Sequence, residues 1–242
     1  MKDRPWENLD DLDGTEASEA IAAFCWSRLA ILRTQQRIYV GLYSDPERVA
    51  VLRNASQTVA GVMDDALFDV IVLGICRLLD PRKAGRTPYR NLTFDLLIAS
   101  LPPSDRTAAF TFARIRLCER AEVLRDRRDK HLAHTDVDSL RQGSEVGWTS
   151  MQDIEIVLQG MGDLLEQIYA SEFERHIVTW PADRFHELGF LRALYFGKTA
   201  HDERKAAFTK EYMGVPLSRN SRLPDLGTIY PKFLRSPFRS AD

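Results

Sequence analysis

Long stretches without proline constrain the fold of this chain more than any other feature of its sequence. Proline is missing from three long intervals, which lie between Pro5 and Pro46, between Pro46 and Pro81, and between Pro103 and Pro181. Proline inside a helix removes a backbone hydrogen bond and clashes with the preceding turn. Proline-free stretches with apolar residues at every third or fourth position are therefore typical of long helices.

The first two of these helices have clear boundaries. Apolar spacing predicts a helix over residues 15–43 and a second one over residues 46–79. The second begins at Pro46 followed by Glu47, and proline with an acidic residue in the first turn favours a helix start. It is expected to end before Pro81, because the residue preceding a proline avoids the helical region. Its later half is apolar nearly all round, which predicts that it is the central, most buried helix.

The remaining sequence predicts more helices of the same kind. They are expected over residues 92–101, from Ser104 into the 130s, from a Ser150–Asp153 capping box to about residue 174, over residues 182–195 and over residues 201–212. No β-hairpin pattern is present. With five or more helices, the predicted fold is all-α, an antiparallel helical bundle. The expected organisation is an acidic segment (1–14), the bundle (15–180), additional C-terminal helices (181–213) and a tail rich in proline and arginine (214–242).

Composition excludes several classes of protein. Lys and Arg total 33 and Asp and Glu total 35, a formal net charge of -2, which argues against a wholly polybasic protein. Three isolated cysteines cannot form a disulfide framework or a zinc knuckle, and Cys25, Cys76 and Cys118 are interpreted as structural thiols. The N-terminus lacks the apolar region of a signal peptide, and no apolar run is long enough to span a membrane. A cytoplasmic protein with no membrane partner is expected.

Reactive side chains are densest at the predicted end of the fourth helix. Two of the five histidines, His131 and His134, lie within residues 125–136 among several arginines and aspartates. His134 follows Arg127 and Arg128, and His131 follows Arg125, with four to six residues between. In a chain so rich in arginine this spacing alone arises by chance, so the placement of the residues must carry the argument.

Arg128 lies at an unusual position for an arginine. Apolar or small residues form a stripe at helical spacing through Phe110, Ala113, Leu117, Ala121 and Leu124. Arg128 is four residues after Leu124 and continues this core-facing stripe. A buried guanidinium is costly unless it is paired or functional. Two interpretations stay open: a carboxylate from a neighbouring helix pairs with Arg128, or Arg128 takes part in chemistry.

Two segments resemble a known family. The sequence Arg128-Asp129-Lys130-His131-Leu132-Ala133-His134 resembles the Arg-(Asn/Asp)-Lys-x-x-Ala-His signature of the HEPN superfamily. Arg77-Leu78-Leu79-Asp80-Pro81, followed by Asn91-Leu92-Thr93 and Leu96-Leu97, is similar to the segment that precedes the signature in AbiU-like abortive-infection proteins of bacteria. The resemblance covers roughly residues 20–175.

The resemblance implies a HEPN-like bundle that forms a homodimer, with two copies of the motif facing each other across a cleft. Active members are metal-independent endoribonucleases that act as toxins or in phage defence, some with a cognate antitoxin protein. Arg128 and His134 would be the catalytic pair, and Asp129 would orient them. Arg77 and Asp80 would support the cleft, although they also fit an ion pair within one helix. No metal and no cofactor are expected.

The chemistry is physically coherent. RNA supplies its own 2′-OH as nucleophile, histidine moves protons near neutral pH, and arginine forks onto the phosphate as negative charge builds. The expected products are a 2′,3′-cyclic phosphate and a 5′-hydroxyl. Nearby cations are expected to hold the RNA backbone without reading sequence, and they are Arg125, Arg127, Lys130, Arg82, Lys83, Arg86 and Arg90.

Geometry leaves one tension. Six residues of ideal helix turn through about 600°, so Arg128 and His134 would point roughly 120° apart. Either the helix ends or bends near Ala133, or each histidine works with an arginine of the partner chain. His131 is the second candidate for the catalytic histidine.

Three further alternatives stay open. One is a catalytically silent HEPN module that binds RNA or a protein. Another is a pocket that binds a nucleotide or other small ligand. A metal site on His131 and His134 with Asp136 and Asp138 lacks a third ligand at strong spacing and is the least favoured.

Overall fold

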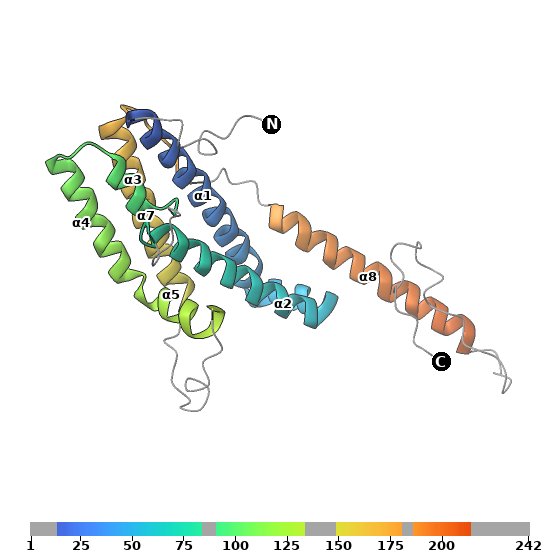
Figure 1. Cartoon of the computed structure of the whole chain (residues 1–242). Coiled ribbons are helices and arrows are strands. Elements are labelled where there is room, and N and C mark those ends of the chain that lie inside the picture. The colour runs from blue at the N-terminus through green and yellow to red at the C-terminus, as the bar shows by residue number, and fades with distance from the viewer. Residues whose placement is uncertain (1–13, 84–90, 134–148, 181–185, 214–242) are drawn as a thin grey trace. The chain divides into compact units, whose positions relative to one another are not determined.

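The all-α prediction is confirmed. The computed structural model describes residues 14–83, 91–133, 149–180 and 186–213, and these residues form helices and short connections without any β-strand (Figure 1). None of the helices in these ranges combines the length and the apolar character that a membrane span requires. Two compact units are present, one up to Tyr195 and one from Phe196 onward.

Helices α1 (Gly14–Tyr43) and α2 (Pro46–Leu79) form an antiparallel pair, as the proline pattern predicts. The side chain of Asp45 caps α2 by accepting hydrogen bonds from the backbone N–H groups of Glu47 and Arg48. Asp80 adopts an extended conformation before Pro81 and ends the helix. A kink at Ser56, with φ -165° and ψ 112°, was not expected from the sequence.

The long helix predicted from Ser104 into the 130s is interrupted. Its first part is α4 (Asp105–Arg120), and the chain turns at Ala121. It then forms α5 (Glu122–Arg127) and the π-helix η2 (Arg128–Ala133). Ala121 is fully buried, and its N–H bonds to the carbonyl of Leu117 while its carbonyl accepts from Arg125. The break therefore follows from tertiary packing, because no glycine or proline marks it.

Helices α3 (Phe94–Ser100) and α7 (Met151–Glu172) complete the bundle. Thr93 caps α3, and the predicted Ser150–Asp153 capping box begins α7. Helix α7 runs antiparallel to α4 and buries the apolar face that includes Ile154, Leu158, Leu165 and Ile168 (Figure 1). The later half of α2 is less central than predicted, since Val70 on it is 46% exposed.

Helix α8 (His186–Met213) is one helix where one or two shorter helices were predicted, at about residues 182–195 and 201–212. Its residues include Gly197, but a single glycine costs only about 1 kcal/mol inside a helix. The first turns of α8 contact α1 and α2, where Leu191 packs with Leu42 and Leu52. Arg37 of α1 forms an ion pair with the buried carboxylate of Glu187 at 3.2 Å.

Candidate functional site

The side chain of Arg128 is held by two carboxylates, one from Asp80 at the end of α2 and one from Asp129 of η2. Its Nη1 donates to Asp80 Oδ1 at 2.8 Å, and its Nε donates to Asp129 Oδ1 at 2.7 Å. The side chain is 22% exposed, so it continues the buried stripe of α4 and α5 only in part. The predicted carboxylate from a neighbouring helix is present, and it is Asp80, the C-cap residue of α2.

These contacts keep Arg128 charged. Its hydrogen bond with Asp129, followed by the one with Asp80, raises the pKa of Arg128 above its ordinary value, although burial acts in the opposite direction. The guanidinium is therefore a fixed cation with a defined orientation. In the described residues no acceptor engages Nη2, so this nitrogen keeps its two donors.

Arg128 begins a π-helix, which places it at an irregular end of the bundle. The six residues Arg128–Ala133 carry the signature up to the position before His134. Short π-helical segments are rare and are frequent at functional sites. The segment Arg128–Ala133 is therefore not an ideal α-helix, and a helix end or bend near Ala133 stays one of the two alternatives. His134, Arg86 and Arg90 lie outside the described residues, and of His131 the structure describes the backbone, which belongs to η2.

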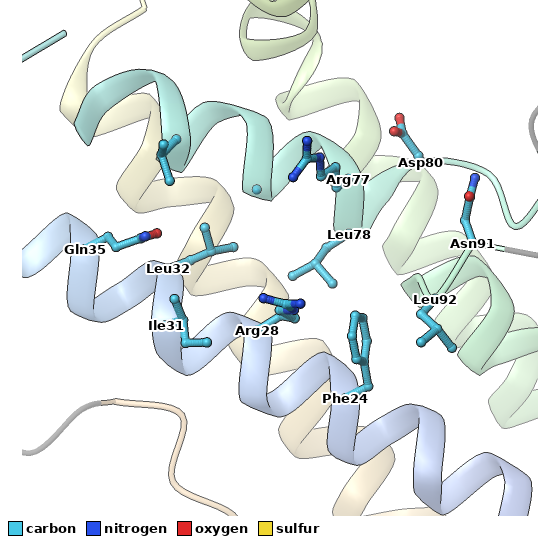
Figure 2. Close-up of a pocket in the computed structure, with 12 residues that line it drawn as sticks. Phe24, Arg28, Ile31, Leu32, Gln35, Arg77, Leu78, Asp80, Asn91 and Leu92 are labelled. Carbon is cyan, nitrogen blue, oxygen red and sulfur yellow. The ribbon is translucent and has the colours of Figure 1, made fainter. Parts of the chain in front are cut away.

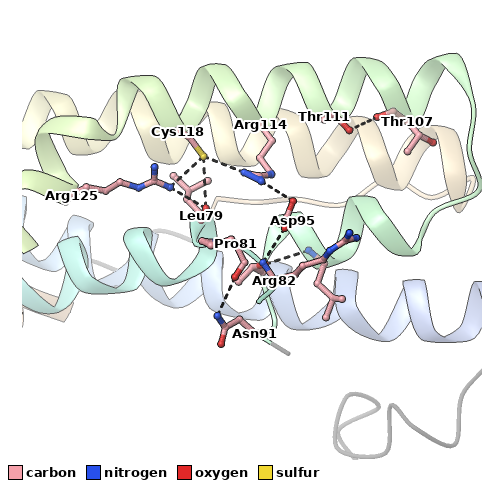
Figure 3. A network of polar contacts seen from close by, with 12 residues as sticks. Leu79, Pro81, Arg82, Asn91, Asp95, Thr107, Thr111, Arg114, Cys118 and Arg125 are labelled. Carbon is pink, nitrogen blue, oxygen red and sulfur yellow. Dashed lines mark hydrogen bonds and ion pairs between the residues drawn. The ribbon is translucent and has the colours of Figure 1, made fainter. Parts of the chain in front are cut away.

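Arg125 fastens the end of α2 to α4 and α5. Its Nη2 donates to the carbonyl of Leu79 at 3.1 Å and contacts Cys118 Sγ at 3.4 Å (Figure 3). The last carbonyls of a helix have no partner inside the helix, and Arg125 supplies one. This capping contact accounts for the position of Arg125, and its contact with RNA stays a prediction.

The connection after α2 is tied down by polar contacts. Asp95 of α3 accepts from the backbone N–H of Arg82 at 2.9 Å and pairs with Arg114 of α4 at 2.7 Å (Figure 3). Asn91 donates to the carbonyl of Pro81 at 3.1 Å. The side chains of Arg82 and Lys83 belong to exposed residues, as a role in RNA binding requires.

The other predicted RNA-binding cations of this region are paired with acids. Arg127 forms an ion pair with Asp69 of α2 at 3.0 Å and lies over the ring of Phe68, and Lys130 pairs with Asp126 at 3.0 Å. Arg127 and Arg128 thus both contact α2, through Asp69 and Asp80. Exposed ion pairs contribute little to stability, so the phosphates of an RNA backbone can compete with the aspartates for these cations.

Comparison with known proteins identifies the family of this chain. The family model for AbiU2, a HEPN family, matches residues 16–171, which is most of the chain and includes both segments singled out above. This chain belongs to the AbiU2 family. No curated protein and no solved structure is a significant match to it. The AbiU2 match spans α1 to α7 and stops before α8.

Two interpretations of Arg77 and Asp80 were open, support for the cleft and an ion pair within α2. Asp80 pairs with Arg128 on η2 and not with Arg77, one turn earlier in α2. Arg77 is exposed and lines a pocket between α1 and α2 with a volume of about 590 Å³ (Figure 2). Sequence reasoning missed the α1 side of this pocket. Its signal is the helical spacing of Phe24, Arg28 and Ile31.

The described part of the chain contains no cluster of side chains that could hold a metal ion. Across residues 14–133, 149–180 and 186–213, without the gap at 84–90, no three His, Cys, Asp or Glu side chains converge as ligands. His134, Asp136 and Asp138, which were weighed as ligands with His131, lie outside the described residues.

Two of the three cysteines, Cys25 and Cys76, are buried, as expected of structural thiols. Burial raises the pKa of Cys25 to about 12 and that of Cys76 to about 11, so both thiols stay protonated at neutral pH. Cys118 is half-buried and lies between the guanidiniums of Arg114 and Arg125, each 3.4 Å from its sulfur.

A second buried arginine, Arg33 of α1, was not anticipated. It is fully buried and donates to the carbonyl of Leu158 at 3.0 Å and to Thr179 Oγ1 at 3.1 Å. Its guanidinium also lies 3.8 Å from the centre of the Trp180 ring. Thr179 in turn donates to Glu166 at 2.6 Å. Arg33 therefore joins α1, α7 and the segment after α7.

Proposed function

We propose that this AbiU2 protein is a metal-independent endoribonuclease of the toxin or phage-defence type, acting in the cytoplasm, with Arg128 and His134 as its catalytic pair. One observation carries the proposal. A permanently charged guanidinium is held in a fixed orientation by Asp80 and Asp129, at the start of the π-helix that leads directly to His134. Membership of a HEPN family supports the same assignment.

Arg128 is suited to bind a phosphodiester. Asp80 and Asp129 engage Nη1 and Nε, so Nη2 remains as a donor whose direction is already set. A donor oriented before the reaction stabilises the negative charge that builds on a phosphoryl oxygen in the transition state. Asp129 thus acts as a positioning residue on the motif itself, and Asp80 does so from α2.

The proposed reaction needs no nucleophile from the protein. An imidazole accepts the proton of the ribose 2′-OH, and the 2′ oxygen attacks the adjacent phosphorus. The bond between phosphorus and the 5′ oxygen breaks, and an imidazolium donates a proton to the departing oxygen. The products are a 2′,3′-cyclic phosphate and a 5′-hydroxyl, and one proton is taken up for each proton released. Histidine ordinarily titrates near pH 6.5 and serves both roles near neutrality.

Two copies of the motif give each step its own histidine. In the proposed homodimer, His134 of one copy would act as the base and His134 of the other as the acid. Mixing wild-type with His134→Ala protein tests whether the site is shared. If the subunits exchange and one site needs the His134 of both chains, mixed dimers are inactive and the activity falls below the share of wild-type subunits, whereas independent sites keep the activity in proportion to that share.

Cleavage in the presence of EDTA tests the proposed function. Wild-type protein is expected to cut single-stranded RNA under these conditions, and His134→Ala protein is expected not to. His176→Ala is the matched control, because His176 is exposed after α7 and outside the motif. Cleavage that survives His134→Ala, or that requires a divalent metal, contradicts the proposal.

A catalytically silent HEPN module is the alternative, and one observation favours it. Two carboxylates already neutralise Arg128, which weakens its attraction for a phosphate. Such a module, whether it binds RNA or a partner such as an antitoxin, would show binding by wild-type protein and no cleavage at any pH.

A further inference from the structure

The pocket between α1 and α2 combines an apolar floor with cations at its edge. Its wall on α1 includes Phe24, Arg28 and Ile31, and its wall on α2 includes Val70 and Arg77. Ile31 is 45% exposed and Val70 is 46% exposed, so apolar surface is open to an incoming group. The pocket volume of about 590 Å³ lies within the range of about 300–1,000 Å³ that is usual for ligand sites.

The two arginines of the pocket are distinguished by their lack of acidic partners. Arg28 and Arg77 are both exposed, and among the described residues no carboxylate lies within ion-pair distance of either. Arg114, Arg127 and Arg128 of the same unit each hold an aspartate. Figure 2 shows Arg28 and Arg77 on the two helices that flank the pocket. Their charge is therefore available to an anion.

Phe24 adds a flat apolar surface beside one of these cations. The guanidinium of Arg28 lies 5.3 Å from the centre of the Phe24 ring. Aromatic rings and guanidinium planes are the surfaces on which single-stranded nucleic acids stack their bases, while cations hold the phosphates. Gly74 lets α1 and α2 approach closely, since a Cβ there would lie 2.3 Å from Leu32, and the pocket opens beside this contact.

The pocket ends beside the candidate active site. Asp80 lines it and also accepts the hydrogen bond from Arg128 Nη1 at 2.8 Å. Asn91 lines the same end and fixes the chain at Pro81. A nucleotide bound between α1 and α2 would therefore be adjacent along the RNA strand to a phosphate bound at Arg128.

We infer that the pocket between α1 and α2 binds a nucleotide of single-stranded RNA next to the cleaved phosphodiester, with its base against the apolar lining of the pocket and its phosphates on Arg28 and Arg77. This inference rests on the proposed function, because it takes the same RNA as ligand. It adds a substrate-binding site that lies outside the signature motif. A protein partner or a second copy of this chain in the pocket would be a different outcome.

The experiment separates binding from cleavage by using RNA that cannot be cut. A short, fluorescein-labelled, fully 2′-O-methylated RNA lacks the nucleophile, and its binding to the full chain is followed by fluorescence anisotropy at several salt concentrations. The test protein is Arg28→Glu/Arg77→Glu, with Arg28→Gln/Arg77→Gln as a second version should the first fail to fold. Arg53→Glu/Arg192→Glu is the matched control, because both residues are exposed and outside the pocket.

The pocket variants are expected to bind about tenfold or more weakly, and the control within about twofold of wild type. Loss of two phosphate contacts should reduce the slope of log K against log salt by about 1.4. Equal losses in pocket and control variants overturn the inference, as does unchanged binding. A pocket variant that becomes monomeric in sedimentation also overturns it, because the pocket would then be a subunit interface. RNA binding through the pocket without cleavage of unmodified RNA contradicts the proposed function alone.

Discussion

Two arginines of this bundle differ in their surroundings, one with a structural role and the other with a proposed role in chemistry. Arg33 is fully buried and is held by a carbonyl, a hydroxyl and an indole ring, and burial lowers its pKa. Arg128 is partly exposed and is held by two carboxylates, whose hydrogen bonds raise its pKa. An arginine closed off by its neighbours cannot meet a substrate, whereas one oriented at an opening can. Orientation with access is thus the property that marks Arg128.

The largest effect is expected at Arg33. Arg33→Ala removes the contacts that join α1 to α7 and leaves the carbonyl of Leu158 without its donor. Truncating a large buried side chain costs about 2–5 kcal/mol, so the midpoint of urea unfolding should fall strongly. Arg28→Ala on the same helix is the control, and this exposed residue should change the free energy of unfolding by no more than about 0.5 kcal/mol. Equal stabilities of the two variants would remove the distinction drawn here.

At Arg128 the effect is expected on activity and not on stability. Arg128→Ala should lower the rate of RNA cleavage by about 10²–10³-fold, because it removes a donor aimed at the developing negative charge. The free energy of unfolding should change by about 1 kcal/mol or less, since the carboxylates left behind reach solvent. Unfolding and cleavage are measured on the same preparation. If the variant unfolds readily and is inactive for that reason, Arg128 has a structural role like that of Arg33.

Glycine substitutions sharpen the contrast in packing. A Cβ at Gly162 would lie 2.3 Å from Arg33 Nη2, whereas a Cβ at Gly61 of α2 would meet no atom within 4 Å. Gly162→Ala should therefore destabilise the protein by about 1–3 kcal/mol through overpacking. Gly61→Ala should stabilise it by about 0.5–1 kcal/mol, because alanine has the better helix propensity. Thermal unfolding measures both, and a stabilising Gly162→Ala would show that the Arg33 region is loosely packed.

The smallest effect is expected at the start of α7 and depends on pH. Hydrogen bonds from Ser150 lower the pKa of Asp153 below its ordinary value of 3.8. A carboxylate with a lowered folded-state pKa stabilises the fold above its unfolded pKa, and this contribution disappears as the pH falls through the folded-state value. Ser150→Ala should cost about 1 kcal/mol at pH 7 and less at pH 3. Ser171→Ala, inside the same helix, should show no such pH dependence in urea unfolding.

Local signals in the sequence predicted most of the helices. Proline placement and end-capping residues gave the limits of α1, α2 and α7, including the Ser150–Asp153 capping box. The turn at Ala121 and the single helix α8 were missed, because both depend on packing or on a tolerated glycine and leave no local mark.

Partners across the fold were harder to predict than the elements themselves. The stripe through Leu124 indicated that Arg128 either pairs with a carboxylate of a neighbouring helix or takes part in chemistry, but it did not identify Asp80 as the carboxylate. Arg33 is four residues after Leu29, the same spacing that separates Arg128 from Leu124, but it is followed by the polar residues Thr34, Gln35 and Gln36, and its burial was missed. Its partners Leu158 and Thr179 are more than a hundred residues away, and only the folded chain brings them together.

Identification of the RNA ends produced by wild-type protein in EDTA tests the central claim most directly. The account predicts a 2′,3′-cyclic phosphate and a 5′-hydroxyl, as well as no cut at a position where a single 2′-deoxynucleotide replaces the ribose. Ends that carry a 5′-phosphate, or a cut at the deoxy position, would contradict it, because attack by the 2′ oxygen could not have produced them.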